Sequence, residues 1–320
     1  MQMVMKELPM KMPVKKHAKP LRSPAVALPL TLLIACSGVG HGQPPAGDAP
    51  VAASLSADAR WLRRPRAERF RAADADWLEA FSAALRREPV GDHDAWTALG
   101  LEVRRRDGVL WLREAAPASG RGAFAVRHDP APHDPVQHDP VRHDPARRIL
   151  VQAPHGDTDL GTRQLALLMF EEQRLLGLSL NSARRDTAPE ADLARGEDNS
   201  FVRIAQVLAE RRRDVRTVQL HGFSANTARQ LSLPDDAIVV GGAAAGDPDL
   251  AAVARCLREA GFAAQGADDR TRSLAGRGNP VGRALRRGSP ARFVHLELGP
   301  AVRERLLADA RAREALTQCL

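Results

Sequence analysis

Two histidines and a pair of aspartates lie directly after predicted strands, and these residue types can bind a metal ion. His155 follows the apolar segment that ends at Ala153, and Asp157 and Asp159 come close behind it. His221 ends a second apolar segment. Two histidines and one carboxylate form a zinc site with a fourth position open for water, which is the arrangement of a hydrolytic centre.

A glutamate supplies the second element of such chemistry. Glu297 lies inside an apolar strand, predicted over 293–298, where an unpaired carboxylate costs free energy. Because side chains alternate between the two faces of a strand, Glu297 shares one face with Phe293 and His295. A glutamate beside an activated water can serve as the general base of hydrolysis.

Each of these residues also has an ordinary structural explanation. Asp157 or Asp159 can cap the helix that follows. His221 can be a hydrogen-bonded histidine of the core, and Glu297 can pair with one of the many arginines. Three such residues at strand ends nevertheless favour a site, because perturbed polar groups cluster where chemistry takes place.

Alternating strands and helices from residue 148 onward position these side chains. Strands are expected at 149–153, 178–181, 215–221, 237–241 and 293–298, and helices at about 161–176, 200–211, 248–259 and 300–316. This alternation predicts an α/β fold of three layers with a mainly parallel, mixed sheet. Because ligands bind at the carboxyl ends of parallel strands, the candidate residues are expected to converge there.

The segment before this alternation is expected to be scaffold. Asp74–Arg87 has the apolar spacing of an amphipathic helix. The segments 96–103 and 109–113 flank Asp107-Gly108, which predicts a hairpin, and 122–127 is expected to add a strand.

Several motifs of the second half resemble those of a known family, in the same order along the chain. The segment VQAPHGDTDLGTRQLALLMFEE contains a Pro-His-x-x-x-Asp-x-x-Thr element, and VQLHGF, GRGNPVGRAL and FVHLELGPAVRERL follow it. Over roughly residues 148–307, the chain resembles an exported bacterial family of the zinc-carboxypeptidase-like superfamily. That superfamily includes N-formylglutamate amidohydrolases and poly-γ-glutamate hydrolases.

This resemblance implies a hydrolase-like fold of the zinc-carboxypeptidase-like type and roles for particular residues. Zinc (Zn2+) is expected on His155, Asp159 and His221, with Glu297 as the catalytic base. The resemblance also implies polar residues that bind the substrate, with an arginine on its carboxylate: Arg184, Arg185, Asn279 and Arg283. The chain departs from carboxypeptidase-type relatives in having an aspartate ligand where they have a glutamate.

Absent motifs and the distribution of charge exclude several other classes. The 320 residues contain no phosphate-binding loop, no Gly-x-Ser-x-Gly turn, no His-Glu-x-x-His and no Cys-x-x-Cys. The formal net charge is +8, but residues 1–35 hold six basic residues and one acid, which leaves only +3 for the rest. A nucleic-acid partner is therefore not expected.

The amino terminus is typical of an export signal. Residues 6–22 are basic, and the apolar run 25–35 is shorter than the roughly 20 residues that span a bilayer as a helix. The sequence LIAC, ending at Cys36, resembles the bacterial lipoprotein processing box, which implies lipidation of Cys36 and a lipid anchor. An ordinary cleaved signal is the alternative. Ser37 indicates the outer membrane, with the protein facing the periplasm.

The chain is accordingly expected to have three parts. Residues 1–35 are the signal peptide, 36–57 a flexible tether rich in Gly, Pro, Ala and Ser, and 58–320 a single α/β hydrolase-like domain. Within the domain, His-Asp-Pro recurs at 128, 133, 138 and 143, and the proline in every unit predicts a disordered loop at 128–145. A metal-binding tract is the alternative. Two further cysteines, Cys256 and Cys319, can pair in an oxidising periplasm or remain as thiols.

These patterns predict a zinc-dependent hydrolase of the cell envelope that cleaves an amide or peptide bond in a carboxylate-bearing substrate, such as a small peptide or an acyl-amino acid. The alternative is a non-catalytic envelope lipoprotein, with a binding or structural role on a degenerate hydrolase scaffold. The two hypotheses differ in geometry. The hydrolase requires His155, Asp159 and His221 to approach a common point, with Glu297 close by.

Overall fold

A computed structural model describes most of the chain beyond the amino-terminal segment. The described residues are 55–63, 66–87, 93–128, 147–244, 246–286 and 293–320, and they belong to one compact unit, residues 45–320. The predicted signal peptide, Cys36, nearly all of the predicted tether and the His-Asp-Pro repeats lie outside the described residues. Leu55 is already buried in the core, three residues before the expected start of the domain at residue 58.

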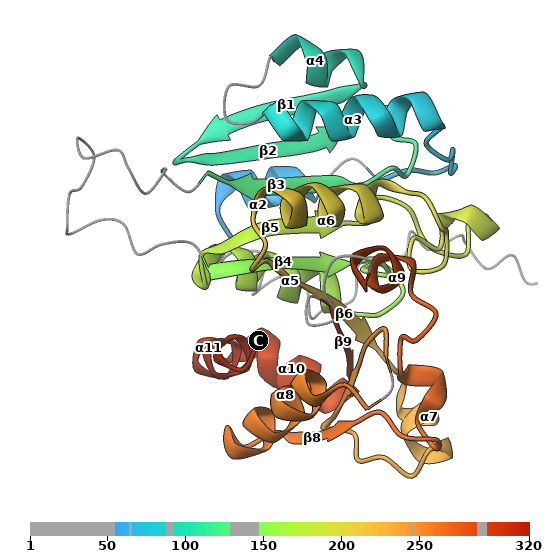
Figure 1. The fold of residues 1–320 in the computed structure, drawn as a ribbon, viewed down its shortest axis with the longest axis vertical. Coiled ribbons are helices and arrows are strands. Elements are labelled where there is room, and N and C mark those ends of the chain that lie inside the picture. Colours follow the sequence, from blue (N-terminus) through green and yellow to red (C-terminus); the bar gives the residue numbers. More distant parts are fainter. Residues whose placement is uncertain (1–54, 64–65, 88–92, 129–146, 245, 287–292) are drawn as a thin grey trace, which may run out of the picture. The chain divides into compact units, whose positions relative to one another are not determined.

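The described residues form a sheet of nine strands, in the order β1-β2-β3-β5-β4-β6-β9-β7-β8 (Figure 1). The strands are β1 (Leu101–Arg106), β2 (Val109–Glu114), β3 (Ala123–Arg127), β4 (Arg147–Ala153), β5 (Leu175–Leu180), β6 (Arg216–Gly222), β7 (Ala237–Gly241), β8 (Ala263–Gly266) and β9 (Phe293–Leu298). The central strands β5, β4, β6 and β9 are mutually parallel. Strands β1 to β3 extend the sheet from β5 in antiparallel fashion, and β7 pairs antiparallel with β9 and parallel with β8.

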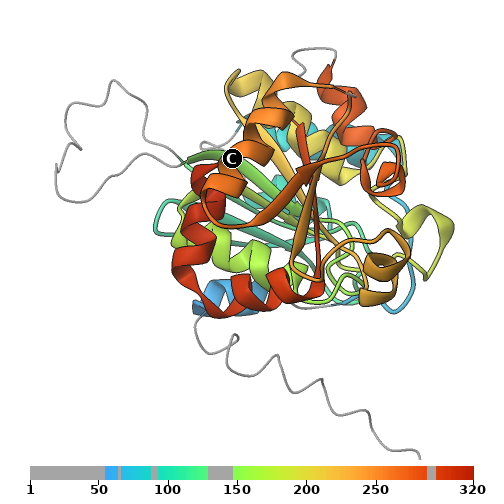
Figure 2. The same cartoon turned by 90° about the horizontal axis from the view of Figure 1, so that it is seen from below.

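Helices cover both faces of this sheet, as Figures 1 and 2 show. One face carries α2 (Ala57–Leu62), α5 (Thr162–Glu172), α8 (Pro248–Glu259), α10 (Pro300–Ala308) and α11 (Ala310–Gln318). The other carries α3 (Ala75–Arg87), α4 (His93–Ala98), α6 (Ser200–Arg211) and α9 (Pro280–Arg286). The short helix α7 (Ala225–Gln230) and the 3-10 turns η1 (Pro189–Ala191) and η2 (Arg272–Leu274) lie in connecting segments. The predicted three-layer α/β fold with a mixed sheet is confirmed.

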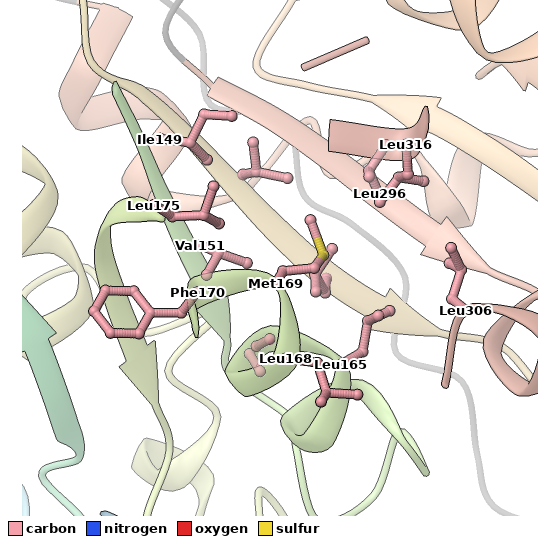
Figure 3. Packing of buried hydrophobic residues seen from close by; sticks show 14 of the residues in the cluster. Ile149, Val151, Leu165, Leu168, Met169, Phe170, Leu175, Leu296, Leu306 and Leu316 are labelled. Atoms are coloured by element: carbon pink, nitrogen blue, oxygen red, sulfur yellow. The ribbon is translucent and has the colours of Figure 1, made fainter. Parts of the chain in front are cut away.

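The core beneath α5 holds the central strands in place (Figure 3). Leu165, Leu168 and Met169 of α5 are at most 2% exposed and pack with Val151 of β4 and Leu296 of β9. Burying one such side chain stabilises the fold by about 1.5–3 kcal/mol relative to leaving it exposed. The strand ends that carry polar residues are therefore fixed by apolar packing on the opposite face.

Several predicted boundaries were wrong where a local conformation interrupts the apolar pattern. The expected strand 96–103 begins with helix α4, and Gly100, with a φ of 73°, separates that helix from β1. The expected helix 161–176 ends at Glu172, and β5 starts directly after Arg174, which has a φ of 50°. The expected helix 300–316 breaks at Asp309, which is extended and caps α11 through the amide of Arg311.

The two cysteines of the folded part are joined by a disulfide between Cys256 of α8 and Cys319 at the end of α11. Their Cα atoms are 5.5 Å apart, and the bridge spans 63 residues of sequence. Of the two states that the sequence left open, the structure has the paired one. No helix in the described part of the chain is long and apolar enough to cross a membrane.

Candidate metal centre

The three predicted metal ligands meet at the carboxyl ends of the parallel strands. The Nδ1 atoms of His155 and His221 are 3.1 Å apart, and each is 3.4 Å from Oδ2 of Asp159. All three side chains are buried, with exposed fractions of 7%, 3% and 5% for His155, His221 and Asp159. Tetrahedral zinc with bonds of about 2.0–2.1 Å separates its N and O ligands by roughly 3.3 Å. The triangle of donor atoms therefore fits a zinc ion.

The backbone around β4 and β6 explains why these side chains meet. Strand β4 ends at Ala153, and the carbonyl of His155 accepts hydrogen bonds of 2.8 Å from the amides of Thr158 and Asp159. That tight turn returns Asp159 to the side of His155. At the end of β6, the amide of Gly222 donates to Oδ2 of Asp159 at 3.1 Å and so fixes the carboxylate beside His221.

Gly222 leaves room for the side chain of Arg303. A Cβ atom at Gly222 would collide with the guanidinium, which donates to the carbonyl groups of Phe223 and Leu298 at 3.0 and 2.6 Å. These bonds tie the segment that follows β6 to the end of β9. Burial lowers the pKa of Arg303, although the charges of Asp159 and Glu297 oppose that effect. Arg303 thus belongs to the framework of the centre.

Ring orientation distinguishes two overlapping groups of metal-binding residue types. The rings of His155 and His221 are 4.7 Å apart and inclined at 78°, so that lone pairs in the two ring planes can point at one ion. His221 also forms a group with His295 and Glu297, but its ring stacks on that of His295 at 4.3 Å and 30°. Lone pairs of stacked rings run side by side and do not converge. The first group is the better metal site.

Asp192, which was not predicted, holds the first histidine from the far side. Its Oδ1 atom accepts a hydrogen bond of 2.8 Å from Nε2 of His155. Nε2 therefore carries the hydrogen, and the lone pair of Nδ1 faces Asp159 and His221. Carboxylates on the outer nitrogen of a ligating histidine are common partners in metal sites. Asp192 lies in the loop between β5 and α6, where no periodic pattern could identify it.

Burial and the neighbouring charges set the protonation of the centre. Burial and the charge of His295 lower the pKa of His221 to about 4, so its ring is neutral at pH 7. Burial raises the pKa of Asp159, but its hydrogen-bonding contacts with His155 and His221 outweigh that effect and lower the pKa overall. For His155, burial lowers the pKa, and bonds with Asp159 and Asp192 raise it by more. An ionised carboxylate and a neutral imidazole are the forms that bind metal.

Glu297 lies opposite His221 in the register of β6 and β9. It is 9% exposed, and its Oε1 atom is 3.2 Å from Nε2 of His295. On this strand Val294, Leu296 and Leu298 enter the core under α5, while Phe293, His295 and Glu297 take the other face, as predicted. The backbone of Gly276, with a φ of 63°, packs directly against the ring of His295. The glutamate is thus held by a histidine beside the metal group.

A cleft of about 720 Å³ opens over the centre, and His155, Asp159, His221 and Glu297 all line it. Arginines dominate its remaining charged lining: Arg185, Arg195, Arg272, Arg277 and Arg303. Arg185 is the nearest of these to the metal ligands, with Nη1 3.1 Å from Nδ1 of His155 and 3.8 Å from Oδ1 of Asp159. Such a lining favours anionic ligands.

The structure brings only part of the predicted substrate-binding set to this cleft. Arg185 and Asn279 line it, whereas Arg184 and Arg283 are not among its lining residues. Arg184 is exposed and forms a two-pronged ion pair with Asp186, and Arg283 pairs with Glu197 at 3.2 Å. Asn279 is buried, and its amide is bonded to Gln219 and to the backbone of α9.

Comparisons with known proteins give distant structural neighbours. No protein-family model matches the chain, and no curated protein sequence matches it either. A zinc-free structure of YndL is 17% identical, with a TM-score of 0.38 over 55% of this chain and 86% of that one. A bacteriophage poly-γ-glutamate hydrolase is 16% identical, with a TM-score of 0.39, and the match covers 63% of this chain and 89% of the hydrolase. An N-formylglutamate amidohydrolase from Ralstonia eutropha is 13% identical, with a TM-score of 0.36, and the match covers 54% of this chain and 91% of the amidohydrolase.

Proposed function

We propose that this protein is a zinc-dependent hydrolase of an amide or peptide bond in a carboxylate-bearing substrate. The observation that carries the proposal is the triangle of His155 Nδ1, His221 Nδ1 and Asp159 Oδ2, with sides of 3.1, 3.4 and 3.4 Å. Three protein ligands leave a fourth position of a tetrahedral ion for water or substrate. When bound, zinc supplies Lewis-acid activation of water and of the scissile carbonyl.

Glu297 is the base in this proposal. It lies across from His221 on the neighbouring strand and lines the same cleft as the three candidate ligands, where it would act on a water activated by the ion. Its carboxylate accepts the proton from the attacking water and returns it to the leaving amine. His295 bonds to Oε1 and thereby leaves Oε2 as the atom for proton transfer.

The arginines that line the cleft support a substrate that carries a carboxylate. Arg185 contacts the metal ligands themselves, while Arg272 and Arg277 line the cleft from the segment before α9. A planar guanidinium binds a carboxylate through two parallel hydrogen bonds and so fixes its orientation. Small acidic peptides and acyl-amino acids are therefore the substrates to be tried first.

A non-catalytic role on the same scaffold would not require the ligand atoms to meet. The described side chains do meet, which supports the hydrolase over a purely structural lipoprotein. Metal sequestration by the His-Asp-Pro repeats is a separate possibility, and deletion of 128–145 tests it. The hydrolase hypothesis predicts that the deletion leaves the content of tightly bound zinc unchanged.

We propose that the enzyme is exported and anchored to the outer membrane through Cys36, facing the periplasm. The disulfide between Cys256 and Cys319 supports an oxidising compartment, because such bridges are rare in the cytosol. Incorporation of labelled palmitate into the wild-type protein, and its loss in Cys36→Ala, tests the anchor. Equal labelling of the two proteins would contradict it.

Hydrolysis assays test the activity directly. The full-length protein, extracted from membranes in detergent, is stripped with a chelator and assayed with and without added zinc against a panel of acyl-amino acids and small acidic peptides. We expect hydrolysis of at least one carboxylate-bearing member, its loss on stripping, and its return with zinc. Activity that survives stripping, or a panel that is untouched by the zinc-loaded protein, would contradict the proposal.

A further inference from the structure

The second metal ligand, His221, is bonded through Nε2 to a chain of buried amides. Gln219 lies two residues before it on β6, and its Oε1 atom is 3.3 Å from Nε2 of His221. Gln219 in turn bonds to Gln152 of β4 and to Asn279, at 2.9 and 2.7 Å. Gln152 and Gln219 are 0% exposed and Asn279 is 4% exposed. We call these three residues the amide chain.

Backbone groups at both ends fix the direction of every bond in the amide chain. The carbonyl of Phe201 can only accept, so the amide nitrogen of Gln152 must donate to it at 3.0 Å. Oε1 of Gln152 is thereby left to accept from the amide nitrogen of Gln219. The orientation of these amides thus follows from the bonding partners and is not an arbitrary choice between oxygen and nitrogen.

The other end leads to the same orientation. The amide of Val281, in the first turn of α9, can only donate, so Oδ1 of Asn279 must accept from it at 3.0 Å. The amide nitrogen of Asn279 is then directed at Oε1 of Gln219. Both ends therefore leave Oε1 of Gln219 as the atom that faces His221.

Because Oε1 of Gln219 can only accept, His221 must carry a hydrogen on Nε2 to form this bond of 3.3 Å. Its lone pair is then on Nδ1, the atom that lies 3.1 Å from His155 and 3.4 Å from Asp159. We infer that the amide chain is a positioning device, which holds His221 in the one tautomer that can bind the metal through Nδ1. The role of the amide chain in metal binding rests on the proposed function. The tautomer of His221 that the amide chain selects does not depend on it.

This inference also gives Asn279 a different role from the one that the sequence indicated. Its amide nitrogen and its oxygen are both engaged inside the protein, by Gln219 and Val281. Asn279 thus orients Gln219 and, through it, His221. The two ligating histidines are oriented by different groups, His155 by the carboxylate of Asp192 and His221 by a neutral amide.

Long-range ¹H–¹⁵N correlation of histidine side chains, on metal-free full-length protein at neutral pH, reads the tautomer without zinc. We expect His221 to be protonated on Nε2 in the wild type. Gln219→Met removes the acceptor at nearly constant volume, and we expect the ring to lose its preference for that tautomer. Gln219→Glu restores an acceptor, and we expect it to restore the Nε2–H form.

Zinc affinity, measured by competition with a chelating dye, is the second readout. Loss of a partner that orients a ligand typically weakens metal binding by about 10- to 100-fold, and we expect this for Gln219→Met but not for Gln219→Glu. Thr217→Val is the matched control, because Thr217 is buried on the same face of β6 and lies outside the amide chain. We expect Thr217→Val to bind zinc as the wild type does.

The outcomes separate this inference from the proposed function. His221 protonated on Nδ1 in the wild type, or an Nε2–H ring that persists in Gln219→Met, would overturn the inference. A wild-type protein that binds no zinc would overturn the proposed function alone, because the tautomer is measured on metal-free protein. Equal zinc affinity of wild type and Gln219→Met would overturn the inference and leave the hydrolase standing.

Discussion

Asp192 accepts a hydrogen bond of 2.8 Å from Nε2 of His155, although 37 residues separate them along the chain. The bond directs the other ring nitrogen of His155 at Asp159 and His221. Asp192 is itself fixed, since its Oδ1 atom accepts from the amide of Ala194 at 3.2 Å and its Oδ2 atom lies 3.4 Å from Arg195. A carboxylate in this position makes the ligand nitrogen a stronger base toward a metal ion.

We predict that Asp192→Asn weakens zinc binding by about 10- to 100-fold, because the amide still accepts the bond but no longer carries the charge. The measurement is the zinc dissociation constant in competition with a chelator. Asp186→Asn is the matched control, since Asp186 is an exposed aspartate that pairs with Arg184. Equal dissociation constants for the wild type and Asp192→Asn would show that the charge of Asp192 does not support the site.

Arg185 places a positive charge against the metal ligands, with Nη1 3.1 Å from Nδ1 of His155. We predict that Arg185→Met tightens zinc binding several-fold, since a cation that repels the ion is removed, and raises KM for an anionic substrate. Arg184→Met changes the adjacent arginine, which is paired with Asp186 and does not line the cleft. Identical zinc affinity and KM in the two variants would mean that Arg185 has neither role.

The lowered pKa of His221 makes the stability of the metal-free protein dependent on pH. Its pKa is about 4 in the folded protein and 6.5 ordinarily, so between these values the unfolded chain binds a proton that the folded protein does not. The free energy of unfolding therefore falls as pH falls from 6.5 to 4, by an amount on the order of 3 kcal/mol from this group.

The His221→Gln variant isolates this contribution. We predict that its free energy of unfolding, from urea titrations at several pH values, depends less steeply on pH in that window than that of the wild type. The raised pKa of His155 acts in the opposite sense, so the difference between the two curves reports His221 together with its coupling to His155. Parallel curves would mean that the ring titrates normally in the fold.

Glu297→Gln separates metal binding from catalysis. The substitution keeps the shape of the side chain and its contact with His295, so we expect the zinc content to stay at the wild-type level. Hydrolysis should fall by about 10²- to 10⁴-fold, the usual contribution of a general base. A variant that keeps wild-type activity, with zinc bound, would remove Glu297 from the mechanism.

The convergence of the candidate ligands could be predicted because each position depends on a strand end. His155, His221 and Glu297 follow or terminate apolar segments that pack under α5, and the parallel pairing of β4, β6 and β9 brings those ends together. Asp159 was within reach of the same reasoning, because it lies one turn after His155.

The groups that orient the ligands were not accessible to the same reasoning. Asp192 lies in a loop whose path depends on Asn181, which donates to the carbonyls of Pro154 and Ala191. Gln152 and Gln219 lie in predicted strands, but the sequence does not indicate what their amides bind. That depends on which residue lies opposite on the neighbouring strand. The sequence also could not show that Arg184 pairs with Asp186 and Arg283 with Glu197.

We propose that His155, Asp159 and His221 bind one zinc ion per chain. Metal analysis of the purified full-length protein tests it most directly, together with His155→Ala, His221→Ala and, as a control, His93→Ala in the exposed start of α4. We predict one tightly bound zinc in the wild type and in His93→Ala, and its loss in the two site variants. A wild-type protein without zinc, or site variants that bind zinc as tightly as the wild type, would show that these three residues do not form a zinc site.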